Sequence, residues 1–302
     1  MASDAMFGGI EGGGTKFVCA LGRSPVHIVD SVSLPTRDAA TTLQDCVRFL
    51  LEAQKRHGTL ASIGFSCFGP IELRPGAAGY GRMLSTPKAG WSGVDVLAPL
   101  RAAFAVPLAL DTDVGAAALA EWKLGAGQGL GSVAYVTVGT GIGGAVAPAG
   151  NAARRLMHAE MGHLPVKRDP RDLHFAGVCP FHGDCLEGLA SGPAVRARWG
   201  CHLDELPREH VARSIIANYL GQMVASIALM HSVERVVFGG GVMSDGTLLP
   251  LIRKAAFGYL NGYLPPLAEL GQMKEYVSAP GLGARAGIAG ALLLTHIWKG
   301  KK

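Results

Sequence analysis

The sequence is poor in the features that mark membrane, disordered and nucleic-acid-binding chains. Of its 302 residues, 17% are charged and 49% are hydrophobic, a balance typical of a folded globular chain. No apolar run reaches the ~18 residues of a membrane span, and residues 1–5 lack the positive segment of a secretory signal. The net charge of +5 is dispersed, and the only basic run is the tail at 299–302, so a nucleic-acid groove is not indicated. We expect a cytoplasmic protein that binds small molecules.

Cysteine is also sparse. Three of the six cysteines, Cys19, Cys46 and Cys67, sit in apolar strand or helix patterns, where a free thiol behaves as a small buried hydrophobe. We expect these three to be free and buried. Cys179 and Cys185 stand instead in a loop that contains histidines.

Glycine is abundant and is concentrated in two turns between strand-like segments, at 10–18 and 136–146. Neither turn is a Walker A loop, because no Gly-Lys-Ser/Thr opens a helix after it. Backbone without a Cβ lets successive amides converge on phosphate oxygens, so the pair predicts two hairpins that grip one nucleotide tail from opposite sides. For either turn alone, the alternative is a tight turn in which glycine only permits positive φ. The residues expected at the nucleotide are Gly13, Gly14, Thr15, Lys16, Thr140, Gly141 and Gly143.

A third glycine cluster, Gly239, Gly240 and Gly241, follows a buried-looking strand. A flat adenine or ribose could lie against this bare backbone, although an ordinary strand-to-helix turn explains the cluster equally well. Together with the two hairpins, it favours a nucleotide-binding protein.

Strand and helix patterns alternate along the chain, which is typical of an α/β fold with two sheets. The expected strands lie within 7–21, 62–68, 108–110, 132–146 and 236–238; the expected helices are 40–57, 114–124, 211–231 and 284–298; and 152–188 is expected to be rich in loops. We place the lobe boundary near 121–131. There the glycine-rich stretch 125–129 suits either a hinge or a loose surface loop.

Two aspartates, Asp111 and Asp113, follow the strand at 108–110. A structural interpretation is that Asp113 caps the helix beginning at Val114. The functional interpretation is that Asp113 accepts the proton of an attacking hydroxyl, a role that in phosphoryl transfer is mostly positioning and charge stabilisation. An aspartate with its ordinary pKa of ~3.9 is ionised at pH 7. Spacing alone leaves both interpretations open.

A metal site is indicated by Cys179, His182 and Cys185 in a seven-residue run, with His163 sixteen positions before Cys179. Two thiolates and two imidazoles form a complete tetrahedral set, as structural zinc sites use. The alternative is a loop in which the two cysteines are merely buried or form a disulfide.

Six motifs together resemble the ROK sugar kinases, and within them the bacterial zinc-containing fructokinases. They are Glu-Gly-Gly-Gly-Thr-Lys at 11–16, Asp-Thr-Asp-Val at 111–114, Gly-Thr-Gly-Ile-Gly-Gly at 139–144, Glu-Met-Gly-His at 160–163, Cys-Pro-Phe-His-Gly-Asp-Cys-Leu-Glu at 179–187 and Gly-Leu-Ala-Ser-Gly-Pro at 188–193. The resemblance runs from Phe7 to about Leu294 and includes smaller pieces such as Ser-Thr-Pro-Lys at 85–88.

The resemblance implies an actin-like, hexokinase-like (ribonuclease H-like) two-lobed α/β fold, with ATP and Mg²⁺ in a cleft between the lobes. The smaller lobe would comprise 1–121 completed by the C-terminal helix at 284–302, and the larger lobe 122–283 with a zinc-binding loop at 163–185. The family also suggests a homodimer.

The same resemblance implies a role for each matching residue. Asp113 becomes the catalytic base and contacts the substrate, and Glu11 reaches Mg²⁺ through water. Glu160, His163 and Glu187 become sugar contacts. A zinc-bound His163 would keep its second ring nitrogen for a sugar hydroxyl, so that Zn²⁺ would orient the sugar pocket.

Two positions depart from the family pattern. Gly115 stands where the family usually has Asn, and Ala284 stands where an Asp commonly follows Gly-Leu-Gly. Glu11 also replaces the Asp that is more usual among actin-like proteins. The first departure removes a possible hydrogen bond to the sugar or to Asp113.

The sequence therefore predicts an ATP-dependent hexose kinase that phosphorylates the 6-hydroxyl of D-fructose, with mannose or glucose as alternative substrates. One rival is a sugar-sensing regulator, but only six residues precede the first expected strand at Phe7, too few for a DNA-binding module. The other rival is a catalytically weak sugar-binding protein. Gly115 in place of the usual Asn favours this rival, and the presence of Asp113 opposes it.

Overall fold

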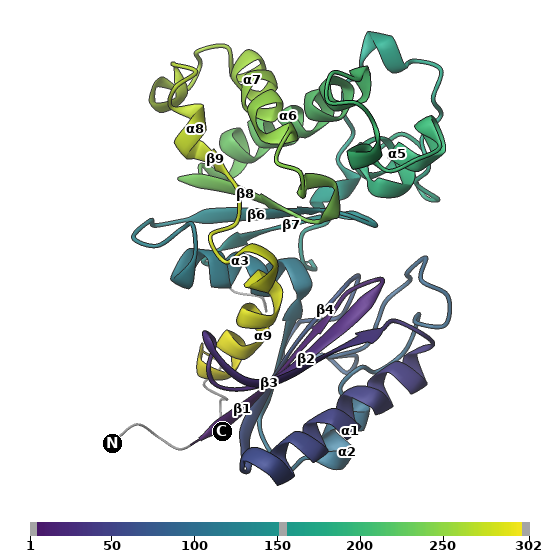
Figure 1. The fold of residues 1–302 in the computed structure, drawn as a ribbon, viewed down its shortest axis with the longest axis vertical. Coiled ribbons are helices and arrows are strands. Elements are labelled where there is room, and N and C mark those ends of the chain that lie inside the picture. The colour runs from purple at the N-terminus through teal and green to yellow at the C-terminus, as the bar shows by residue number, and fades with distance from the viewer. Residues whose placement is uncertain (1–4, 151–155, 298–302) are drawn as a thin grey trace. The chain divides into compact units, whose positions relative to one another are not determined.

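Two β-sheets, each with its own hydrophobic core, organise the chain (Figure 1). The computed structural model describes residues 5–150 and 156–297. The chain divides into a first unit drawn from Met1–Ala120, Ala149–His158 and Arg285–Lys302, and a second unit drawn from Glu121–Pro148 and Ala159–Ala284. The basic tail at 299–302 and Trp298 lie outside the described residues.

The first unit contains a five-stranded sheet of order β3-β2-β1-β4-β5. Strand β1 pairs antiparallel with β2 and parallel with β4, and β5 is parallel to β4. The strands are β1 (Met6–Gly12), β2 (Lys16–Ser24), β3 (His27–Pro35), β4 (Leu60–Cys67) and β5 (Leu108–Thr112). The helices are α1 (Ala39–His57), α2 (Ala98–Ala103), α3 (Asp113–Leu124), within which the chain passes into the second unit, and α9 (Ala286–Ile297).

Helices α1 and α9 cover opposite faces of this sheet (Figure 1). Side chains alternate along β2, so Cys19 and Leu21 join the core beneath α1 while Ala20 packs with Leu292 of α9. Helix α1 begins where Asp38 accepts a hydrogen bond from Thr41 N (2.9 Å), and it ends before a glycine with positive φ. With both faces covered, the β1 strand is almost wholly buried.

The second unit contains a four-stranded sheet of order β7-β6-β8-β9, with α6 and α7 over one face (Figure 1). Its strands are β6 (Val133–Val138), β7 (Ile142–Ala147), β8 (Arg235–Gly239) and β9 (Val277–Ser278). Its helices are α4 (Leu186–Ala190), α5 (Gly192–Trp199), α6 (Val211–His231), α7 (Leu248–Leu260) and α8 (Met273–Tyr276). Short 3₁₀ turns are η2 (Met161–His163), η3 (Pro170–Asp172), η4 (Leu203–Glu205), η5 (Gly241–Met243), η6 (Pro265–Leu267) and η7 (Gly283–Arg285).

Glu121 fixes the glycine-rich stretch at 125–129. Its fully buried carboxylate accepts hydrogen bonds from the amides of Ala126 (2.8 Å), Gly281 (2.9 Å) and Leu282 (2.9 Å). The Arg235 side chain donates to Ala126 O. The alternative of a loose surface loop is therefore wrong, because a buried carboxylate with three amide partners orders the segment.

Both glycine turns form the expected antiparallel hairpins, and 152–188 is rich in loops over its described part. The expected final helix begins at Ala286, because residues 283–285 form the 3₁₀ turn η7. Strands β3 and β9 and helices α2, α4, α5, α7 and α8 were not expected from the sequence. Among the described residues, no helix is long and apolar enough to cross a membrane.

Candidate functional site

Hydrogen bonds to its carbonyl oxygens hold the turn between β1 and β2 in place. Phe68 N donates to Gly12 O (2.8 Å). Thr36 donates from its hydroxyl to Gly13 O (2.7 Å) and from its amide to Thr15 O (2.9 Å). These contacts fix the conformation of the turn.

The glycines of the expected nucleotide site differ in how much space surrounds the position of a Cβ. A Cβ on Gly12 would lie 2.7 Å from the ring of Phe17, so the protein's own packing requires glycine there. A Cβ on Gly14 or on Gly241 would meet no protein atom within 4 Å. The space before these two residues is open, as close approach of a ligand would need.

Glu11, the next-to-last residue of β1, places its carboxylate at the first turn of α9. The amide of Ile288 donates to this carboxylate, and a Cβ on Gly287 would lie 2.1 Å from Glu11 Oε1. Burial, with a smaller contribution from the negative charge of Asp113, raises the pKa of Glu11 to about 7. A divalent cation would stabilise the ionised form of both carboxylates, so these residues fit Mg²⁺.

Asp113 is the first residue of α3, directly after β5. The hydroxyl of Thr112 accepts from Gly115 N (3.0 Å), so Thr112 makes the capping contact that the spacing left open for Asp113. Asp113 Oδ1 accepts from the adjacent Val114 N (2.8 Å). Burial raises the pKa of Asp113 to about 6, above the ordinary value expected from the sequence, yet the group is still mostly ionised at pH 7.

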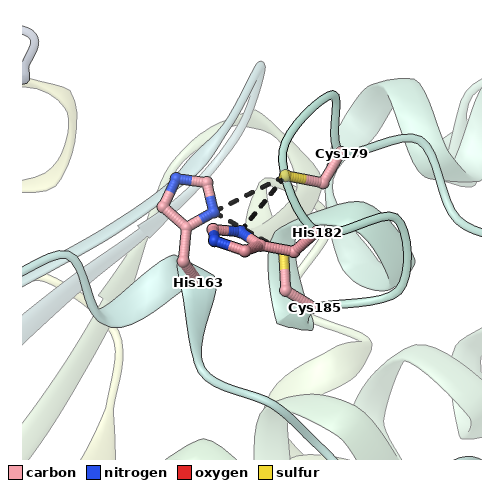
Figure 2. A group of neighbouring side chains, drawn as sticks. All are labelled: His163, Cys179, His182 and Cys185. Atoms are coloured by element: carbon pink, nitrogen blue, oxygen red, sulfur yellow. Dashed lines mark hydrogen bonds between the residues drawn. The ribbon is translucent and has the colours of Figure 1, made fainter. Parts of the chain in front are cut away.

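The four predicted metal ligands come together within the second unit. One ligand atom from each of His163, Cys179, His182 and Cys185 lies within 4.8 Å of the other three (Figure 2). Cys179 and Cys185 are buried, His163 is half-buried and His182 is exposed. All six cysteines are among the described residues and all are free, so a disulfide between Cys179 and Cys185 is excluded.

The distances in this cluster fit a tetrahedral zinc ion. Cys179 Sγ lies 3.7 Å from Nδ1 of both His163 and His182, and Cys185 Sγ lies 3.5 Å from His163 Nδ1. Zinc bonds of ~2.3 Å to sulfur and ~2.0–2.1 Å to nitrogen in a tetrahedron would place sulfur and nitrogen about 3.6 Å apart. Since Nδ1 of His163 faces the cluster, its Nε2 points away from it (Figure 2).

The metal cluster is braced against the second hairpin through Ile142, the first residue of β7. Ile142 N donates to Glu187 Oε2 (2.8 Å), two residues beyond the ligand Cys185. In addition, a Cβ on Gly162 would lie 1.8 Å from Ile142 O, so the turn that carries His163 packs directly on β7. Glu160 immediately precedes that turn, and its carbonyl accepts from His163 N (3.0 Å).

The third glycine cluster lies at the end of β8. Gly240 has a φ of 94°, and a Cβ there would lie 2.4 Å from Val138 O of β6, so packing demands this glycine. A pocket of about 50 Å³ opens beside Gly241 and is also lined by Gly192, Val242 and Ser244. Thr140 and Gly141 form the turn between β6 and β7, and Gly143 lies in β7 opposite Thr137.

The sequence model of the ROK family matches residues 7–297. The chain belongs to the ROK family. It is 42% identical over 293 residues to the fructokinase of Zymomonas mobilis, covering 96% of each chain. It is 38% identical over 291 residues to a putative fructokinase of Bacillus subtilis, covering 96% of this chain and 95% of that one. The ROK hexokinase of Thermus thermophilus superposes with a TM-score of 0.73 at 26% identity, covering 98% of this chain and 100% of that one. The expected actin-like, hexokinase-like α/β fold is confirmed.

The structure explains how this ROK chain accommodates its unusual residues. A Cβ on Gly115 would lie 2.5 Å from Asp111 Oδ1, so the carboxylate of Asp111 lies where a larger side chain would begin. Ala284 is exposed within η7, just before α9. Glu11, by its extra length, reaches the first turn of that helix.

Sequence reasoning missed residues that support the ROK site, such as Thr36 and Glu121. They act through backbone partners 23 and up to 161 positions away in the chain. A lone Thr or Glu outside a motif offers no local pattern that could have identified it.

Proposed function

We propose that this protein is an ATP-dependent fructokinase that transfers the γ-phosphate of ATP to the 6-hydroxyl of D-fructose. The observation that carries the proposal is that Asp113 and Glu11 lie within electrostatic range of each other in the unit that holds the first glycine hairpin. The relatives named fructokinase, which match nearly the whole chain, support fructose as the substrate.

The nucleotide is assigned to the glycine elements. Gly13, Gly14, Thr15 and Lys16 would hold the phosphates from the first hairpin, and Thr140, Gly141 and Gly143 from the second. The adenosine is assigned to Gly239, Gly240 and Gly241, of which Gly241 lines a pocket. Glu11 would hold Mg²⁺ through water; the ion, when bound, neutralises charge that develops on the phosphates.

Asp113 is the proposed catalytic base. Its pKa of about 6 leaves it ionised at pH 7 and closer to the pH of the reaction than an exposed aspartate, which favours proton acceptance from the attacking hydroxyl. Because Thr112 makes the helix-capping contact, the carboxylate of Asp113 is not committed to that structural role.

The sugar is assigned to Asp113, Glu160, His163 and Glu187, and the four-residue cluster to Zn²⁺. With Nδ1 of His163 directed at the cluster, the zinc would hold the ring so that Nε2 meets a sugar hydroxyl. We also propose that the protein acts as a homodimer, as the family resemblance suggests.

The deciding experiment is an ADP-release assay with a panel of hexoses, run on the wild type and on Asp113→Asn. We expect kcat/KM to be highest for fructose, with mannose next and glucose and N-acetylmannosamine below, because a site that reads hydroxyls rejects analogues that leave its polar groups unpaired. The variant should keep fructose and ATP binding but lose at least ~100-fold in kcat, or ~2.7 kcal/mol of barrier stabilisation.

Three outcomes would contradict the assignment. Glucose ranking first would overturn the substrate. More than about a tenth of wild-type kcat in Asp113→Asn would overturn the base. Fructose binding without turnover in the wild type would favour the catalytically weak sugar-binding protein.

A further inference from the structure

Lys88 brings a positive charge to the turn between β1 and β2. Its Nζ donates a hydrogen bond to Gly14 O (2.7 Å), although the two residues are 74 positions apart in the chain. An ammonium group carries three donors, and Gly14 O uses one of them. The side chain is half-buried, so its head group is not a freely rotating surface charge.

The segment that carries Lys88 is anchored in the same core as the hairpin. Trp91 N donates to Lys88 O (3.2 Å), and the Trp91 side chain is fully buried. Its indole stacks on Phe17 at 5.5 Å between ring centroids and donates from Nε1 to Arg37 O (3.1 Å). Because Phe17 is the second residue of β2, the Lys88 turn and the glycine turn share one rigid support.

With this contact, the protein itself engages each carbonyl from Gly12 to Thr15. Those of Gly12, Gly13 and Thr15 accept from Phe68 and Thr36, and that of Gly14 accepts from Lys88. Carbonyl oxygens would repel a phosphate, and the Lys88 ammonium at Gly14 O offsets this repulsion with a positive charge.

We propose that Lys88 is a positioning residue for phosphoryl transfer, which holds Gly14 by its carbonyl and places a fixed positive charge at this glycine, where the space around the Cβ position is open. This inference rests on the proposed kinase function. Phosphoryl transfer depends mainly on positioning and on charges arranged before the reaction, so a lysine held this firmly should favour the triphosphate over nucleotides without a phosphate chain.

The test compares three substitutions that separate the hydrogen bond from the charge. Lys88→Met removes both, Lys88→Gln can donate without a charge, and Lys88→Arg keeps both. The matched control is Lys55→Met on the exposed face of α1. Each variant is assayed for kcat and KM with ATP, for the Kd of ATP, ADP, AMP and fructose, and for its thermal midpoint.

We expect Lys88→Met to lower kcat/KM for ATP about 30-fold and to weaken ATP and ADP binding, with AMP and fructose Kd values and the thermal midpoint unchanged. Lys88→Arg should recover most of the loss and Lys88→Gln only a small part of it, while Lys55→Met should match the wild type. These differences would follow from a charge directed at the phosphate chain.

Several results would overturn the inference. They are an unchanged kcat/KM in Lys88→Met, an equal loss for AMP and ATP, or recovery by Lys88→Gln as complete as by Lys88→Arg. A wild type that binds ATP but phosphorylates no hexose would instead contradict the proposed function, and the nucleotide affinities would still decide the role of Lys88.

Discussion

The two glycine hairpins have similar sequences but are supported in different ways. The turn between β1 and β2 is held by direct hydrogen bonds to its carbonyls from Thr36, Phe68 and Lys88. The turn between β6 and β7 is closed by Gly139 N donating to Gly141 O (2.8 Å), and Gly139 O accepts from Gly192 N (2.8 Å) at α5.

The second hairpin depends in addition on the metal loop. Glu187 accepts from Ile142 N and Gly162 packs on Ile142 O, and both Glu187 and Gly162 lie within two residues of a metal ligand. A common glycine pattern therefore says that a turn is tight, while its stability depends on partners far away in the chain. Disturbing the metal loop should affect the second hairpin and spare the first.

Metal removal should produce the largest difference between the two hairpins. In chelated wild type and in Cys179→Ser, we expect fructose Kd to rise at least ~30-fold, because His163 and Glu187 lose their support, while ATP binding weakens only a few-fold. Hydrogen exchange should accelerate at 139–144 and stay unchanged at 12–16. Cys67→Ser is a matched thiol control outside the cluster. A preparation without bound zinc and with unchanged fructose affinity would contradict both the coupling and the metal assignment.

A pair of glycine substitutions should sharpen the same contrast. Gly162→Ala places a Cβ against a backbone oxygen that cannot move freely, so we expect a loss of about 2–3 kcal/mol in the free energy of unfolding. Gly14→Ala meets no protein atom and should change that free energy by less than about 0.5 kcal/mol, while weakening ATP binding. Chemical denaturation and nucleotide titration measure the two effects. Equal stability losses would show that the hairpins are not supported differently.

The change of kcat with pH should follow the ionisation of Asp113, which lies in the first unit. Asp113 accepts a proton only when ionised, so we expect kcat to fall about tenfold per pH unit as the pH drops below about 6. Fructose binding measured over the same range controls for damage to the second unit. A rate that stays flat down to pH 4.5 would contradict the assignment of Asp113.

Glu11→Gln should give the smallest effect. The pKa of Glu11 is about 7 in the folded protein and ordinarily 4.5, so the folded state binds its proton more tightly. The contribution of the Glu11 carboxyl to the free energy of unfolding is therefore fully present below pH 4.5 and is lost as the pH rises to about 7. Without Mg²⁺ at pH 8, the variant should be more stable by roughly 1–2 kcal/mol after allowance for solvent screening, and no more stable at pH 4.5.

Denaturation curves with and without Mg²⁺ provide the check on Glu11, with Glu52→Gln on the exposed face of α1 as the control. Adding Mg²⁺ should stabilise the wild type and leave Glu11→Gln nearly unaffected. The same pH slope in Glu11→Gln and the wild type would show that another group is responsible.

Much of the fold follows from local pattern. Both hairpins, α1, α6 and the metal ligands have periodicity or spacing that is legible in the sequence. Helix α5 and strand β9 were missed because short elements carry too few residues for a periodic pattern. The start of α3 was one residue late because Thr112 and Asp113 are both good caps, and only the contact with Gly115 N distinguishes them.

The residues of the candidate site were likewise predictable only in part. The motif residues were found, but the residues that hold them were not, because a hydrogen bond such as Lys88 to Gly14 depends on how the core brings distant turns together. The roles assigned to Glu160, Glu187 and the nucleotide residues stay predictions. The raised pKa of Asp113 could not be predicted either, since it follows from burial.

The number of reactive thiols should report how much of the protein carries metal. Cys19, Cys46 and Cys67 are fully buried in the first unit, Cys179 and Cys185 would be metal-bound, and Cys201 is half-exposed. A thiol reagent added to the metal-loaded protein should therefore modify Cys201 first. Chelation should add two further groups that react more slowly, because both are buried and burial raises the pKa of Cys185 to about 11. Counting reactive sulfur atoms in a colorimetric assay would then report the loaded fraction of any preparation before a substrate is added.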